Sequence, residues 1–146
     1  YGDAAMTVPV GKVSAEAQRL MDVTARALAA GIDAIKPGAH VADISAAVQD
    51  TAEEAGFSVV REFVGHGIGR KLHEDPQVPN YRTGARGVRL EEGLVLAIEP
   101  MVNFGRAEVY VKDDGWTAAT RDGRLSAHFE HSVAVTANGP YILSQL

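Results

Sequence analysis

The chain contains no cysteine. This absence excludes disulfide bonds and thiol catalysis, and it excludes the thiolate-rich zinc sites that usually serve structural roles. It does not fix the cellular compartment, because a chain without thiols is compatible with reducing and oxidising surroundings alike. Any metal site in this protein must therefore be built from carboxylates and imidazoles.

Long apolar runs and basic runs are also missing. No segment approaches the roughly 20 apolar residues that cross a bilayer, and no basic region followed by an apolar stretch marks a signal peptide. The formal net charge is −5, and no basic face is evident, which argues against nucleic acid as the main partner. At 146 residues, 46% of them hydrophobic, the chain is long enough for one domain with its own core. We therefore predict one globular domain without a membrane or nucleic-acid partner.

The chain begins with Tyr1 rather than methionine, and residues 1–10 already have strand-like apolar content. A native protein rarely starts inside a sheet. We therefore expect that a larger segment precedes Tyr1 and that residues 1–146 form an N-terminally incomplete domain. A trimmed terminus or a tag scar is the alternative.

Two helical patterns follow. Ser14 is a good N-cap, and apolar residues recur at helical spacing as far as Ile35, before Lys36-Pro37-Gly38 ends the pattern. A second apolar stripe runs from Val41 to Ala55 and ends at Gly56. We predict a pair of helices whose apolar stripes face a common core.

After Gly56 the pattern changes to short β-type runs. We predict strands within 57–63, 94–98, 107–111, 116–120, 125–136 and 141–143, a glycine-rich loop or strand end at 65–69, and a loop at 76–87. Asp-Gly and Asn-Gly pairs between such runs indicate antiparallel hairpins. The fold class is therefore α+β, with two helices packed on one face of a curved antiparallel sheet.

Five side chains are candidates for chemistry: Asp3, His66, His73, Glu99 and Glu130. Carboxylate and imidazole donors suit Mn, Co, Fe or Zn at a hydrolytic centre. Two carboxylates able to bridge, with at least one imidazole, form the donor set of a two-metal hydrolase. The sequence thus predicts a hydrolytic metal site.

The two histidines also have simpler interpretations. His66 lies between Gly65 and Gly67, where glycine lets the backbone approach a ligand closely, but it could be a structural histidine in a tight turn. His73 taken alone could be a surface residue. The pair is more informative than either histidine alone.

The carboxylates have alternatives of the same kind. Glu99 follows a continuous apolar run, so a buried Glu99 must bind a metal or pair with an arginine such as Arg61 or Arg89. Strand alternation puts Glu130 on a polar face together with His128 and Ser132, and an exposed edge strand is the alternative to a cavity.

Several longer motifs resemble one known family. They are Gly65-His66-Gly67-Ile68-Gly69, then His73, Ile98-Glu99-Pro100-Met101-Val102-Asn103, Asp113-Asp114-Gly115-Trp116-Thr117 and residues 126–131. In order, spacing and flanking residues the chain resembles the type I methionine aminopeptidases of the pita-bread fold, from Gly2 to about Leu143. The step from Glu99 to Glu130 leaves no room for the insertion of type II enzymes. The related X-Pro aminopeptidases and prolidases share the ligand types but not these surroundings.

The resemblance implies two adjacent divalent metal ions, Co, Mn, Fe or Zn, with Asp3 and Glu130 as bridging ligands. His66 would be the imidazole ligand and Glu99 a terminal ligand. The family has a further aspartate about eleven residues before the bridging one, a position that would precede Tyr1. We therefore expect one of the two metal sites to be weakened in this chain.

The resemblance also implies the roles of the substrate-contacting residues. Glu99 would move a proton from water to the leaving amine, and His73 would stabilise the developing oxyanion without binding metal. Phe63, Leu72 and Trp116 match positions at or near the pocket for the methionine side chain. Leu72 stands where many relatives carry phenylalanine, which would reshape that pocket.

The implied function is metal-dependent removal of N-terminal methionine from peptides and nascent chains with a small second residue, in the cytoplasm. The intact family enzyme is a monomer, and this chain could need a partner fragment or associate with itself. The alternative function is a pita-bread module that binds peptides or proteins without hydrolysing them.

Overall fold

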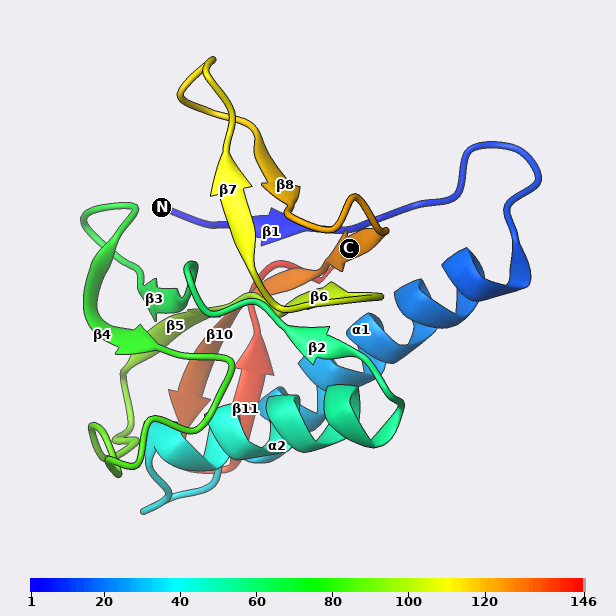
Figure 1. The fold of residues 1–146 in the computed structure, drawn as a ribbon. Helices are drawn as coiled ribbons and strands as arrows, with labels where there is room; N and C mark the ends of the chain where they lie inside the picture. Colours follow the sequence, from blue (N-terminus) through cyan, green and yellow to red (C-terminus); the bar gives the residue numbers. More distant parts are fainter. Residues whose placement is uncertain (146) are drawn as a thin grey trace.

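The computed structural model describes residues 1–145. Two helices, α1 (Ala15–Asp33) and α2 (Val41–Glu54), pack against each other on one side of the molecule (Figure 1). Ser14 begins α1, and its hydroxyl accepts a hydrogen bond from the Ala17 amide at 3.1 Å. At the start of α2 the Asp43 carboxylate accepts one from the His40 amide at 2.7 Å. Neither helix is long and apolar enough to cross a lipid bilayer.

The larger sheet is antiparallel throughout. Its strands lie in the order β1 (Ala4–Ala5), β10 (Glu130–Thr136), β5 (Val95–Ile98), β3 (Gly65–Gly67) and β4 (Glu74–Val78). The last strand, β11 (Gly139–Ile142), pairs with β10 as well. Both helices lie on one face of this sheet (Figure 1), and the buried apolar residues of that face form the main core with them.

The remaining strands form a second sheet and a hairpin. The second sheet has the order β2 (Ser58–Val59), β6 (Met101–Asn103) and β9 (Ser126–His128). Its buried residues, with the first half of α1, make a second apolar cluster that includes Leu20, Phe57 and Val102. The hairpin consists of β7 (Val109–Val111) and β8 (Ala118–Thr120), and it projects away from the helices (Figure 1).

One two-stranded ribbon runs through both sheets. In the larger sheet Ile98 of β5 pairs with His131 of β10, and in the second sheet Met101 of β6 pairs with His128 of β9. Both pairs have residue numbers that sum to 229, so the register continues without an insertion. The ribbon passes from one sheet to the other at residues 99–100 and 129–130, where its two strands are not paired with each other in either ladder.

The predicted α+β class, with two helices on one face of a curved antiparallel sheet, is confirmed. Several predicted strands were wrong in extent. Residues 1–10 contain only the two-residue strand β1, and the predicted strand at 57–63 is reduced to β2. The run 125–136 is divided at Phe129, because the ribbon changes sheets there. The predicted loop 76–87 overlaps β4. This strand lies at the edge of the sheet, where Pro76 and charged residues are tolerated, so its sequence does not have the usual apolar pattern of a strand.

Candidate metal centre

Three carboxylates and one imidazole converge where β5 ends and β10 begins. Asp3 directly precedes β1, His66 is the central residue of β3, and Glu130 begins β10; each offers one atom within 4.8 Å of the others. Glu99 directly follows β5, and its Oε1 atom lies 3.4 Å from His66 Nε2. The structure therefore brings four of the five candidate residues together from four strands that are distant in the sequence.

The glycines beside His66 are required by the close packing of β3. A Cβ atom built on Gly65 would lie 2.3 Å from the carbonyl oxygen of Ala97 in β5. One built on Gly67 would lie 2.1 Å from the carbonyl oxygen of Asp75 in β4. The two glycines thus let β3 fit between its neighbours and carry the His66 ring to the carboxylates.

The orientation of the His66 ring favours a donor role. Its Nδ1 atom lies 2.9 Å from the carbonyl oxygen of Gly67. Because a carbonyl only accepts, Nδ1 carries the proton in this contact, and Nε2 of the neutral ring is left with its lone pair. That atom faces Glu99 Oε1 and lies 4.0 Å from Asp3 Oδ2. A tautomer fixed by a backbone carbonyl is the usual arrangement of a metal-binding histidine.

No lysine or arginine in the described part of the chain lies within 4.0 Å of Asp3, Glu99 or Glu130. The Oε1 atom of Glu130 is buried and has no hydrogen-bond partner. An isolated buried carboxylate is costly unless it is paired or coordinates a metal. The orphaned oxygen and the His66 lone pair therefore fit a divalent cation, and the set of oxygen and imidazole donors suits Mn, Co, Fe or Zn.

The pKa of Glu99 is raised by its burial and by the nearby carboxylates. Burial, together with the neighbouring carboxylates of Glu130 and Asp3 and against an opposing effect of His128, raises the pKa of its carboxyl from 4.5 to about 7. A carboxyl group with a pKa near neutrality can both take and give a proton under physiological conditions.

The simpler interpretations of the two glutamates are wrong. Arg61 does not pair with Glu99 but lies over the ring of Tyr81, and Arg89 lies beside Gly38. Glu130 is not on an exposed edge: it is 5% exposed, and β10 has neighbours on both sides.

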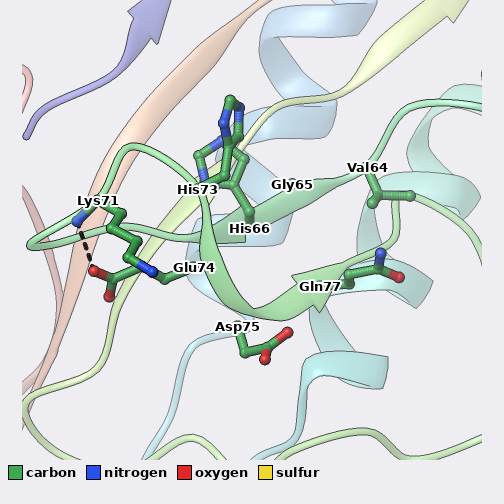
Figure 2. A pocket seen from close by; sticks show the side chains of 8 residues that line it. All are labelled: Val64, Gly65, His66, Lys71, His73, Glu74, Asp75 and Gln77. Atoms are coloured by element: carbon green, nitrogen blue, oxygen red, sulfur yellow. Dashed lines mark hydrogen bonds between the residues drawn. The ribbon is translucent and has the colours of Figure 1, made fainter.

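His73 is exposed, and its ring lies 4.4 Å from that of His66 between centroids, in an edge-on arrangement. Both histidines line an open cavity of about 590 Å³. Figure 2 shows the two rings side by side, whereas Gln77 and Asp75 lie farther along β4. His73 is not part of the ligand cluster, but it stands next to one of its members at the cavity.

The other predicted substrate residues are not gathered there. The cavity is lined by Val64 and Lys71, the chain neighbours of Phe63 and Leu72, rather than by those two residues themselves. Leu72 is 38% exposed, and Trp116 lies between β7 and β8 with 90% of its surface exposed.

Sequence reasoning did not single out His128 as a site residue. Its Nε2 atom lies 3.7 Å from Glu130 Oε2, and its Nδ1 atom lies 3.4 Å from the carbonyl oxygen of Pro100. The nearby carboxylates of Glu130 and Glu99 raise the pKa of His128 and outweigh the opposing effect of burial. The available signal was strand alternation, which put His128 on the face of Glu130.

These features place the chain among proteins of the pita-bread fold. The chain belongs to metallopeptidase family M24, whose model matches residues 1–137. It is 52% identical over 144 residues to a methionine aminopeptidase of Clostridium perfringens, covering 99% of this chain and 58% of that protein. Methionine aminopeptidase 1 of Bacillus subtilis is 49% identical over 146 residues, with 100% and 59% covered.

The crystal structure of a methionine aminopeptidase from Thermotoga maritima superimposes with a TM-score of 0.97 at 51% identity, covering 100% of this chain and 59% of that one. The chain thus spans less than two thirds of the length of the relatives that it matches.

Proposed function

We propose that this chain carries the metal-binding part of a methionine aminopeptidase, which removes N-terminal methionine from peptides and nascent chains with a small second residue. The observation that carries the proposal is the cluster of Asp3, His66, Glu99 and Glu130, in which His66 and Glu130 are buried and Asp3 and Glu99 are partly buried. In the described part of the chain this cluster has no lysine or arginine within 4.0 Å. The names and similarity of the relatives from C. perfringens and T. maritima support the substrate class.

Asp3 and Glu130 are the proposed bridging ligands, and His66 and Glu99 the proposed terminal ligands. When bound, divalent cations lower the pKa of water and polarise a peptide carbonyl. We propose two such ions. Co, Mn, Fe and Zn all suit the donors.

Glu99 is the proposed proton carrier. It accepts a proton from water that attacks the peptide carbonyl and returns it to the leaving amine, a task that a carboxyl with a pKa of about 7 performs well near neutral pH. His73 is the proposed hydrogen-bond donor to the carbonyl oxygen as negative charge develops on it, because its ring lies at the cavity beside His66.

The methionine side chain is proposed to contact Phe63, Leu72 and Trp116. Phe63 and Leu72 adjoin cavity residues in the chain, which supports the first two. Trp116 is supported only by the motif, since it lies on the exposed β7–β8 connection. Because nascent chains are made in the cytoplasm, we propose that the protein acts there.

The test is methionine release from a Met-Ala-Ser peptide with added Mn²⁺ or Co²⁺, with EDTA as the control and Glu130→Ala as the inactive variant. We expect release that depends on the metal and on Glu130. Absence of release from a chain that binds the metal would favour the non-catalytic peptide-binding alternative.

A further inference from the structure

The segment that carries Asp3 lies in a fixed register beside β10 and β9. Ala4 pairs with His131 and Ala5 with Glu130, so the paired residue numbers sum to 135. The regular backbone ladder stops after these two residues. A two-residue strand has little hold of its own.

A hydroxyl group continues the register at each end of β1. At one end, Ser132 Oγ accepts a hydrogen bond from the Asp3 amide at 2.9 Å and donates one to the Asp3 carbonyl at 2.8 Å. At the other end, Thr7 Oγ1 accepts from the His128 amide at 2.9 Å and donates to the His128 carbonyl at 3.0 Å. The residue numbers of the two pairs, Asp3 with Ser132 and Thr7 with His128, again sum to 135, so both contacts keep the register of β1. We call these two paired contacts hydroxyl bridges.

Beyond the ladder and the hydroxyl bridges, the N-terminal amine of Tyr1 donates a hydrogen bond to the Gly69 carbonyl at 2.9 Å, and the apolar side chains of the segment are largely exposed. Met6 is 66% exposed, Val8 58% and Val10 89%, so burial of apolar surface contributes little to its docking. Ser132, in contrast, is 2% exposed, and its Oγ hydrogen bonds both go to the backbone of Asp3. The position of the Asp3 backbone therefore depends on a hydroxyl from the opposite strand.

We propose that Ser132 and Thr7 are positioning residues of the metal centre. Their hydroxyl bridges fix the register of residues 3–7 against β9 and β10 and so hold the Asp3 carboxylate against His66 and Glu130. A slip of one residue would turn the Asp3 side chain to the other face of the sheet. This inference rests on the proposed metal centre.

The variants are Ser132→Ala and Thr7→Val, which remove one hydroxyl each. Ser132→Thr and Thr7→Ser keep the hydroxyl and serve as conservative rescues. Thr136→Val is the matched control: its hydroxyl accepts from the Asn138 amide and donates to the Gly139 carbonyl, but it lies at the other end of β10.

Two measurements on the 146-residue chain separate the possible results. Hydrogen–deuterium exchange of the metal-free protein reports the docking of residues 1–10. Calorimetric titration with Mn²⁺ reports the centre itself. We expect Ser132→Ala and Thr7→Val to speed exchange in residues 1–10 and to raise the Kd for Mn²⁺ by roughly 10- to 100-fold. The rescue variants and Thr136→Val should have the wild-type exchange rates in residues 1–10 and the wild-type Kd for Mn²⁺.

Two outcomes would overturn the inference: an unchanged Kd in both hydroxyl-free variants, or unchanged exchange in residues 1–10. A wild-type chain that binds no Mn²⁺ would contradict the metal centre instead, and the exchange data would still decide whether the hydroxyl bridges hold the segment.

Discussion

Glu99 and Glu130 lie opposite each other at the point where the ribbon of β5–β6 and β9–β10 passes between the two sheets. The register of the flanking pairs, Ile98 with His131 and Met101 with His128, places them there. Two carboxylates face one another with no lysine or arginine of residues 1–145 close enough to neutralise them. Such an arrangement opposes folding unless a cation or a proton is bound.

Replacing Glu99 by glutamine should stabilise the metal-free chain at neutral pH. The pKa of Glu99 is raised to about 7 in the folded state, so between about pH 4.5 and 7 the folded chain holds a proton that the unfolded chain has lost. The free energy of unfolding therefore falls as pH rises through this window. Thermal melts at several pH values, in EDTA, should show this fall in the wild type and a smaller one in Glu99→Gln. An identical pH slope in both proteins would mean that Glu99 is not the group that titrates.

Replacing His66 by alanine should weaken Mn²⁺ binding by 100-fold or more, on the order expected for loss of a ligand rather than of an outer partner. His40→Ala is the control, because His40 lies at the start of α2 and contacts Arg86 rather than the carboxylates. Calorimetric titration measures both. Equal affinities in the two variants would argue that His66 is only a structural histidine.

Adding a methyl group at Gly67 should destabilise the fold, because that Cβ would lie 2.1 Å from the carbonyl oxygen of Asp75. We expect Gly67→Ala to lower the free energy of unfolding by about 1–3 kcal/mol, the usual range for overpacking. Gly2→Ala, whose Cβ would meet nothing within 4 Å, is the control. Urea denaturation compares them, and a Gly67→Ala chain as stable as Gly2→Ala would contradict the tight packing of β3.

Replacing His73 by alanine should lower kcat for methionine release by roughly 10²- to 10³-fold, the usual cost of losing a donor to a developing oxyanion. The affinity for Mn²⁺ should not change, since His73 is outside the ligand cluster. Gln77→Ala, at the far part of the same cavity, is the control for a general disturbance. Steady-state kinetics and metal titration together decide, and a loss of metal affinity in His73→Ala would make it a ligand.

The sequence was sufficient for the fold class and for much of the site. Capping at Ser14 and the helical spacing that follows it are local signals, and both helices were predicted close to their observed bounds. The glycines around His66 and the apolar run before Glu99 likewise mark residues whose side chains meet neighbouring strands. Each of these features depends on residues that are close together in the chain, so it can be recognised in a single sequence.

The predictions that were wrong concern strand bounds that depend on contacts between distant segments of the chain. The strand predicted within residues 1–10 has only two residues in the structure. On either side of them, the hydroxyl groups of Ser132 and Thr7 take the place of backbone-to-backbone hydrogen bonds. The division of the run 125–136 at Phe129 follows from the sheet change opposite Glu99 and Pro100. None of these contacts leaves a periodic signal in the sequence.

Electron paramagnetic resonance of Mn²⁺ tests the central claim most directly, because free Mn²⁺ gives a strong signal that is reduced when the ion binds protein. Titrating Mn²⁺ into the wild-type chain and into Glu130→Gln compares the cluster with a version that lacks its buried carboxylate. We predict that the wild type reduces the free signal in proportion to its concentration and that Glu130→Gln reduces it far less. Equal signals from the two proteins would contradict a metal centre at Asp3, His66, Glu99 and Glu130.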